Sequence, residues 1–243
     1  WWAAVNAGGA FTNVFLGGWL EAAGWRDVFV RDFTGDGRAD VLARASFGAW
    51  YLGTGTGAAL AFAPFGGWNE AAGWRDVRAV DWDGDGRTDV VGRTAAGQWW
   101  LGRNAAGGIV STPLGSWVEA AGWRDVRSGD FDGDGRTDLI ARTSGGGWWL
   151  ARNVNGNAMA FLPYGGWSEP AGWRDVMAAN VAGDDRPDLI GRTADGAWWA
   201  AESTGGGTVN RFLGAWSAAA WEDVMAANFT GSGYADVVGR ING

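Results

Sequence analysis

Short apolar stretches alternate with glycine- and aspartate-rich turns along the whole chain, and this pattern predicts β-strands. From Asp76 onward the sequence reads DVRAVDW, the turn DGDG, RTDVVGR, the turn TAAG, QWWLGRN, a glycine-rich turn and IVSTPLGSW. Runs of about five to seven residues rich in Val, Ile, Leu and Trp, bounded by Gly and Asp, are typical of strands. No 3.6-residue apolar period continues long enough for an ordinary helix. Each such unit therefore predicts four antiparallel strands.

The four-strand unit is a sequence repeat in which tryptophan occupies fixed rows. One row is the motif Trp-x-Asp-Val, which recurs every 48 to 50 residues. A second tryptophan precedes that motif by five or six residues, and a third position carries Trp-Trp, or Trp50-Tyr51 in one unit. These rows hold 19 of the 20 tryptophans, so the aromatic residues belong to the repeat itself. A four-stranded repeat of this length is typical of a propeller blade.

The two ends of the chain predict how the blades close. The chain opens at the third-strand position and ends after the second strand, so joining Gly243 to Trp1 continues the repeat in register. An open array would instead need atypical capping repeats. We therefore expect an all-β fold, a single five-bladed propeller over 1–243 with one composite blade. The expected blades are 25–68, 74–117, 123–167, 173–216, and 221–243 together with 1–19. Because the chain begins with Trp and not Met, we expect a processed or partial chain.

Composition and charge exclude several classes of function. The chain has no Cys, His or Lys, which excludes disulfides, thiolate or imidazole metal sites and Schiff-base chemistry. Its 19 basic residues face 27 acidic ones, and a net charge of -8 argues against nucleic-acid binding. The apolar runs are far shorter than the roughly 18 residues of a membrane helix, so no membrane insertion is expected.

Carboxylates recur at alternate positions of the turn between the first and second strand. The turns at 81–89 and 130–138 read D-x-D-G-D-G-R-T-D, and the turn at 32–40 carries Thr at its third position. Carboxylates this close repel one another unless a cation lies between them. Oxygen ligands at positions 1, 3, 5 and 9, a backbone carbonyl at 7 and glycine at 6 describe a Ca²⁺ loop. The expected side-chain ligands are Asp32, Thr34, Asp36, Asp40, Asp81, Asp83, Asp85, Asp89, Asp130, Asp132, Asp134 and Asp138.

Two alternatives to a strand–loop–strand calcium site can be weighed. An EF-hand requires Glu at position 12 and flanking helices, whereas Gly92 and Ala141 stand there and strands flank the loops. The other alternative is an ordinary solvated Asp-Gly turn without a bound ion. The carboxylate spacing recurs in register in three loops, which favours calcium over that alternative. The loops at 180–188 and 228–236 have lost carboxylates. We expect about three calcium ions, with these two loops weak or empty.

The repeated segments resemble a known family. DFTGDGRADVLAR at 32–44, DWDGDGRTDVVGR at 81–93 and DFDGDGRTDLIAR at 130–142 are similar to FG-GAP/VCBS repeats of the integrin α propeller and many secreted bacterial proteins. The resemblance implies a propeller with structural calcium sites, in which the carbonyls of Arg38, Arg87 and Arg136 occupy the seventh position. Integrin propellers have seven longer blades, whereas this chain has five short ones. Loops without a bidentate Glu suit calcium-rich surroundings, so an extracellular or cell-surface location is expected.

The glycine–tryptophan segments carry a second, shorter resemblance. GGW at 17–19, 66–68 and 165–167 is similar to the repeat of five-bladed tachylectin-type lectins, which bind monosaccharides between blades. That resemblance implies sugar binding by the tryptophan of this row, with a glutamate two residues later as a partner for sugar hydroxyls. The alternative is that these tryptophans fill the core and the glutamates cap turns. The candidate ligand-binding residues are Trp19, Trp68, Trp117, Trp167, Trp216, Glu21, Glu70, Glu119 and Glu169.

Three function hypotheses follow. The first is a non-catalytic, calcium-stabilised lectin whose repeated weak sites act through avidity, with glycans as partners. The second is a structural or adhesive propeller that binds a cell-surface protein or assembles with itself. An enzyme is not expected, because 20 of the 21 aspartates belong to the loops or to the Trp-x-Asp-Val row and only Asp195 stands outside. The recurrent Asp of that row and the Arg that ends each second strand predict Arg–carboxylate pairs between blades.

Overall fold

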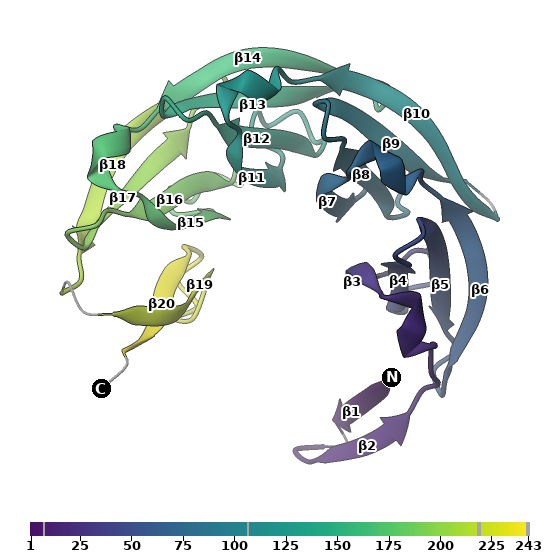
Figure 1. Ribbon diagram of the computed structural model, residues 1–243. Helices are drawn as coiled ribbons and strands as arrows, with labels where there is room; N and C mark the ends of the chain where they lie inside the picture. Colours follow the sequence, from purple (N-terminus) through teal and green to yellow (C-terminus); the bar gives the residue numbers. More distant parts are fainter. Residues whose placement is uncertain (7, 106, 218–219, 242–243) are drawn as a thin grey trace. The chain divides into compact units, whose positions relative to one another are not determined.

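The chain is an all-β protein built from repeated antiparallel sheets. The computed structural model describes residues 1–6, 8–105, 107–217 and 220–241. It contains four four-stranded sheets and two two-stranded sheets, connected by single-turn 3-10 helices (Figure 1). The described residues include no helix with the length and apolar character to cross a membrane. The expected four-strand unit and propeller-type fold class are confirmed.

The chain separates into two compact units, Trp1–Trp117 and Val118–Gly243. The first unit holds a two-stranded sheet and two complete blades, called blade 1 (β3–β6) and blade 2 (β7–β10). Its strands are β1 (Trp2–Asn6), β2 (Phe11–Phe15), β3 (Arg26–Arg31), β4 (Asp40–Arg44), β5 (Ala49–Gly55), β6 (Leu60–Gly67), β7 (Arg75–Val80), β8 (Asp89–Arg93), β9 (Gln98–Ala105) and β10 (Gly108–Ser116). Its 3-10 helices are η1 (Glu21–Ala23) and η2 (Glu70–Ala72).

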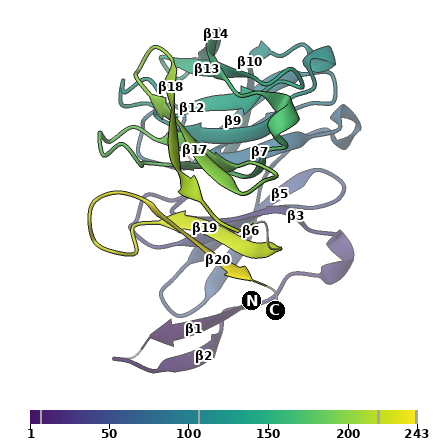
Figure 2. The ribbon, with the colours of Figure 1, turned by 90° about the vertical axis from the view of Figure 1, so that its left-hand side faces the viewer.

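The second unit holds blade 3 (β11–β14), blade 4 (β15–β18) and the two-stranded sheet β19–β20 (Figure 2). Its strands are β11 (Arg124–Gly129), β12 (Asp138–Arg142), β13 (Gly147–Val154), β14 (Ala158–Gly166), β15 (Arg174–Ala179), β16 (Asp188–Arg192), β17 (Ala197–Ser203), β18 (Thr208–Ala215), β19 (Trp221–Ala227) and β20 (Asp236–Ile241). Its 3-10 helices are η3 (Glu119–Ala121) and η4 (Glu169–Ala171). The composite fifth blade that would join β19–β20 to β1–β2 stays a prediction.

The second strand of each blade is the buried centre of the sheet. In β4, β8, β12 and β16 all five residues are buried, from the leading Asp to the closing Arg. Such a strand packs on both of its faces, which explains why its sequence is a continuous apolar run and not an alternating one. Neighbouring blades of a unit meet through their first strands and through their last strands, as β3 meets β7 and β6 meets β10.

A bulge in the first strand of each blade sets an arginine–aspartate pair. In blade 1 the pairing shifts between Arg26 and Phe29, and Asp27 between them takes a positive φ of 47°. This left-handed backbone is uncommon outside glycine, although Asp tolerates it better than most residues. The carboxylate of Asp27 accepts hydrogen bonds from Nε and NH2 of buried Arg44. The equivalent pairs are Asp76–Arg93, Asp125–Arg142 and Asp175–Arg192. The pairs therefore lie within a blade, where the sequence had suggested a position between blades, because the bulge turns the Asp toward its own second strand.

Three tryptophans per repeat pack as one cluster. The indole of Trp167 stacks on that of Trp173 with ring centroids 4.0 Å apart, and Trp148 meets Trp167 edge-on at 5.3 Å. The same arrangement occurs at Trp68, between Trp74 and Trp50. Offset-stacked and edge-on arrangements are those that indole rings prefer. The tryptophan after the glycine pair is therefore the centre of each cluster.

These clusters depend on glycine in the next blade. A Cβ on Gly191 of β16 would lie 2.8 Å from Cζ3 of Trp167, and one on Gly92 of β8 would lie 2.7 Å from the same atom of Trp68. Neither glycine has a positive φ, so the reason for glycine here is space for the indole and not backbone conformation.

We expect Gly191→Ala to lower the free energy of unfolding by about 1–3 kcal/mol, because the added methyl group overpacks the contact with Trp167. Urea unfolding followed by tryptophan fluorescence measures this change. Gly206→Ala is the matched control, because a Cβ there meets no atom within 4 Å. Equal stability of the two variants would contradict the proposed role of Gly191.

Candidate metal loops and aromatic pockets

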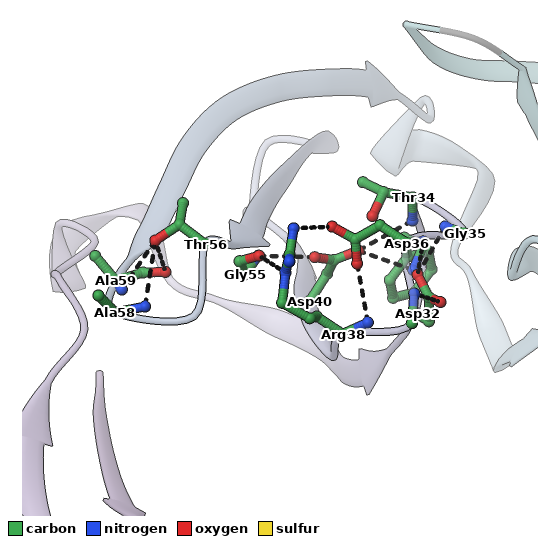
Figure 3. A network of polar contacts seen from close by, with 12 residues as sticks. Asp32, Thr34, Gly35, Asp36, Arg38, Asp40, Gly55, Thr56, Ala58 and Ala59 are labelled. Atoms are coloured by element: carbon green, nitrogen blue, oxygen red, sulfur yellow. Dashed lines mark hydrogen bonds and ion pairs between the residues drawn. The ribbon is translucent and has the colours of Figure 1, made fainter.

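The turn between the first two strands is folded by its own carboxylates. In blade 1, Asp32 accepts hydrogen bonds from the backbone N–H groups of Gly35 and Gly37 (Figure 3). These bonds curl the loop around its first residue, as an Asx turn does. Asp36 pairs with the guanidinium of Arg38, two residues later (Figure 3). The loop thus has a defined shape that depends on side chains the sequence had assigned to a metal.

The last aspartate of the loop is a buried anchor. Oδ2 of Asp40 accepts hydrogen bonds from the backbone N–H groups of Phe33 and Thr34, and Oδ1 accepts one from Gly55 at the end of β5. One carboxylate therefore ties the loop, the second strand and the third strand together. The equivalents are Asp89, Asp138 and Asp188, each of which also accepts three backbone hydrogen bonds.

Two loops bring three carboxylates to one point. In blade 2 these are Asp81, Asp83 and Asp89, each offering one oxygen, and the oxygens lie within 4.8 Å of one another. In blade 3 the corresponding residues are Asp130, Asp132 and Asp138. An all-oxygen donor set of this kind is what hard cations such as Ca²⁺ take. The two groups could hold a metal ion.

The fifth-position aspartates face away from these groups. Asp85 pairs with the guanidinium of Arg87, and Asp134 pairs with that of Arg136. In blade 1 the third position is Thr34, so only Asp32 and Asp40 remain beside Asp36. The structure therefore assembles positions 1, 3 and 9 in two of the three expected loops. The fourth carboxylate joins an arginine at the rim.

Burial and a neighbouring carboxylate raise the pKa of the last aspartate in the loops of blades 2 and 3. Burial raises the pKa of Asp89 to about 6, and the charge of Asp83 adds to this effect. Burial raises the pKa of Asp138 to about 7, with a further contribution from the charge of Asp132. A cation between such groups would favour their ionised forms. The electrostatics of the cluster therefore fit a bound cation.

The two remaining loops keep the fold without the full carboxylate set. In 180–188, Asn180 accepts the hydrogen bond from Gly183 N–H and Asp188 keeps its three backbone partners. In 228–236, Asn228 accepts the hydrogen bond from Gly231 N–H. The loop shape thus depends on its first and last side chains, which Asn and Asp can both supply at the first position.

The tryptophans proposed for sugar stacking lie largely inside the protein. Trp68, Trp117 and Trp167 are buried, whereas Trp19 and Trp216 are partly exposed. Trp68 donates its indole N–H to Ser111 Oγ of blade 2, and Trp167 donates to Asn210 Oδ1 of blade 4. Each of these two rings is anchored in the following blade. Burial at three positions favours the core interpretation that the sequence had left open.

Two of the glutamates proposed for sugar hydroxyls are engaged by arginine. Glu70 pairs with buried Arg44, and Glu169 pairs with buried Arg142. Each therefore completes an Asp–Arg–Glu triad across one blade and the turn that follows it. Glu21 and Glu119 begin the equivalent helices η1 and η3. The carboxylates of Glu70 and Glu169 therefore take part in structural ion pairs.

Two hollows open beside Trp19 and Trp167 of the proposed row, and a different pair of aromatic residues contributes to each lining. In blade 4 a cavity of about 290 Å³ lies among Trp173, Trp199 and Thr193, with Ser168 and Asn210 at its polar side. In blade 1 a cavity of about 530 Å³ is lined by the equivalent Trp25 and Tyr51, together with Phe47, Phe62 and Pro64. The side chains of Trp173, Trp199, Trp25 and Tyr51 are all partly exposed. Neither of these two rows was among the ligand-binding residues predicted from the sequence. The signal for this site was the Trp-Trp pair itself, because the second member must point away from the buried face of its strand.

The repeats identify the family. A family model of the FG-GAP-like repeat matches residues 32–92, 81–141 and 130–191. This chain belongs to the FG-GAP-like repeat family. The three matches run through the first three aspartate loops and reach the second strand of blade 4, so this FG-GAP-like protein carries the family repeat over most of its length.

No curated protein matches this FG-GAP-like chain. Two solved structures of BBS1N in complex with ARL6DN are similar to it. The crystal soaked with mercury has a TM-score of 0.46 and 11% identity, covering 88% of this chain and 73% of that one. The crystal soaked with lead has a TM-score of 0.43 and 12% identity, covering 86% and 77%.

We expect Asp138→Asn to lower the free energy of unfolding by about 1–3 kcal/mol in the presence of a calcium chelator, because the amide cannot accept all three backbone hydrogen bonds. Asp134→Asn is the control, since that carboxylate is exposed and pairs only within the rim of the loop. Its effect should stay within about 0.5 kcal/mol. If both variants lose the same stability in chelator, the anchoring role assigned to Asp138 is wrong.

Proposed function

We propose that this FG-GAP-like propeller is a non-catalytic, calcium-binding protein that binds carbohydrate through pockets repeated from blade to blade. The observation that carries the proposal is the pocket of blade 4, where Trp173 and Trp199 border a hollow with hydroxyl and amide groups at its edge. Carbohydrate recognition combines aromatic surface for the apolar face of a sugar with polar groups for its hydroxyls. Several such pockets on one molecule would bind a glycan-coated surface through avidity.

Calcium is the proposed occupant of the aspartate loops. The carboxylate groups of blades 2 and 3 supply hard oxygen ligands. Burial, with a smaller contribution from a neighbouring carboxylate, raises the pKa of Asp89 and Asp138, and a cation beside them would favour their ionised forms. The loop of blade 1, with Thr34 at its third position, would supply a third, weaker site. The ligand sets proposed from the sequence, including the carbonyls of Arg38, Arg87 and Arg136, stay proposals. The proposed location is extracellular or at the cell surface, where calcium is abundant.

Protein binding is the second candidate, and the pocket of blade 1 favours it. Its lining is apolar, and Phe47 at its rim is 63% exposed. An exposed aromatic beside an apolar hollow suits an apolar side chain of a protein partner, such as a cell-surface protein or a second copy of this chain. In that case the propeller would serve as an adhesive or structural module.

We expect millimolar calcium to raise the melting temperature relative to chelator, because a ligand that binds only the folded state stabilises it. Each site contributes about 2.7 kcal/mol at a free concentration one hundred times its dissociation constant. Asp83→Asn and Asp132→Asn should each reduce the increase, whereas Asp184→Asn in the reduced loop should not. Differential scanning calorimetry measures the shift, and equal melting temperatures with and without calcium would contradict calcium binding.

On a glycan array in millimolar calcium, we expect labelled protein to give selective signal on neutral terminal sugars. Trp199→Ala should lower that signal, because it removes one aromatic wall of the blade 4 pocket. Circular dichroism of the same variant provides the check on folding. A blank array with folded protein would reject carbohydrate binding and leave the protein-binding propeller as the better hypothesis.

A further inference from the structure

One turn position distinguishes blade 4 from the others. The turn before the third strand reads Thr193-Ala-Asp195-Gly in blade 4, and the position of Asp195 is occupied by Phe47, Ala96 and Gly145 in blades 1, 2 and 3. Asp195 is also the aspartate that the loops and the Trp-x-Asp-Val row leave unused. The equivalent turns of blades 1, 2 and 3 form without a carboxylate at this position. The position of Asp195 beside a pocket therefore points to a functional role.

The turn places Asp195 at the edge of a two-part hollow. One part, about 290 Å³, holds Trp173, Ser168 and Asn210; the other, about 420 Å³, holds Asp195 and Pro170. Ala171, Thr193 and Trp199 line both parts, so the indole of Trp199 borders each. The larger part alone is within the size range of ordinary small-ligand sites. The two hollows are neighbours that meet at Trp199.

Local hydrogen bonds hold the carboxylate in place. Thr193 Oγ1 donates a hydrogen bond to Oδ1 of Asp195 and accepts one from Ala197 N–H. The Thr193 bond is the main cause that lowers the pKa of Asp195, so the group is ionised and acts only as an acceptor at neutral pH. The side chain is exposed, which leaves it accessible to a ligand. The turn presents an oriented acceptor at the rim of the hollow.

The residues that line the hollow select among ligand classes. Among the described residues no basic side chain lines either part, so an anionic ligand would meet only the charge of Asp195. The hydroxyl of Ser168 and the amide of Asn210 match sugar hydroxyls, whereas a quaternary ammonium ion would use only the indole rings and the carboxylate and leave these two neutral groups unused. A carboxylate accepts strong hydrogen bonds from hydroxyl donors. The lining fits a neutral saccharide.

We propose that blade 4 carries the selective saccharide site of this protein, with Asp195 as the residue that determines its specificity for neutral sugars of at least two units. This rests on the proposed carbohydrate-binding function and adds the blade, the residue and the ligand class. Trp199 separates the two sugar positions, Trp173, Ser168 and Asn210 contact one unit, and Asp195 binds hydroxyls of the other. The equivalent pocket of blade 1 has Phe47 in place of this acceptor and binds saccharide more weakly.

The test is isothermal titration of the calcium-loaded protein with neutral disaccharides (cellobiose, maltose, lactose and chitobiose), with sialyllactose and choline chloride as charged probes. We expect one neutral disaccharide to bind, with Asp195→Asn and Asp195→Ala each lowering its affinity about tenfold or more. Both substitutions are on an exposed turn, so the fold should persist. Ala96→Asp, which supplies the acceptor to blade 2 beside Thr94 and Trp100, should add a second binding event.

Several outcomes would overturn this assignment. Binding of a disaccharide that Asp195→Ala leaves unchanged would remove Asp195 and blade 4 from the site, while carbohydrate binding itself would stand. Preference for sialyllactose or for choline chloride would show that the ligand class is wrong. Absence of binding by every saccharide, here and on the glycan array, would reject the proposed carbohydrate function and the assignment with it.

Discussion

Each blade depends on one buried carboxylate at the start of its second strand. Asp40, Asp89, Asp138 and Asp188 each accept three backbone N–H bonds, two from the loop before the strand and one from the end of the third strand. Burying a carboxylate is costly unless its oxygens are hydrogen-bonded, so this arrangement leaves the loop little freedom. The same residue is the ninth position of the proposed metal loop. The fold and the proposed metal site therefore use the same carboxylate oxygens. A cation added to the loop would reinforce a geometry that already exists.

The tryptophan rows contribute both to the core and to the surface of the protein. The ring after the glycine pair fills the space between blades, as Trp68 and Trp167 do, and a glycine in the next blade makes room for it. That ring in turn supports the partly exposed indole of the next motif, Trp74 or Trp173. A platform stacked on a buried ring is rigid, which lowers the entropy a ligand must remove when it binds. The pockets are thus a consequence of how the blades pack.

Residue positions that are the same in every blade differ in role from positions that vary between blades. The Asp27–Arg44 pair and its equivalents recur in every blade, are buried or half-buried and serve packing. Positions that vary lie at the rims of the pockets, where Phe47 and Asp195 occupy the same place in two blades. An exposed rim tolerates substitution because it carries little packing energy. One scaffold can then present an aromatic pocket with an apolar rim residue in blade 1 and one with a carboxylate at its rim in blade 4.

The sequence by itself determined the strand pattern, the repeat length and the fold class, because periodicity and turn chemistry are local properties of the chain. It could not decide which tryptophan of each repeat faces water, since both candidate rows are equally aromatic and only packing against the next blade buries Trp68 and exposes part of Trp74. Nor could it show that Asp85 joins Arg87 or that Glu70 joins Arg44. The first pairing follows from the curled shape of the loop, and the second from the close approach of η2 to the second strand of blade 1, which exist only in three dimensions.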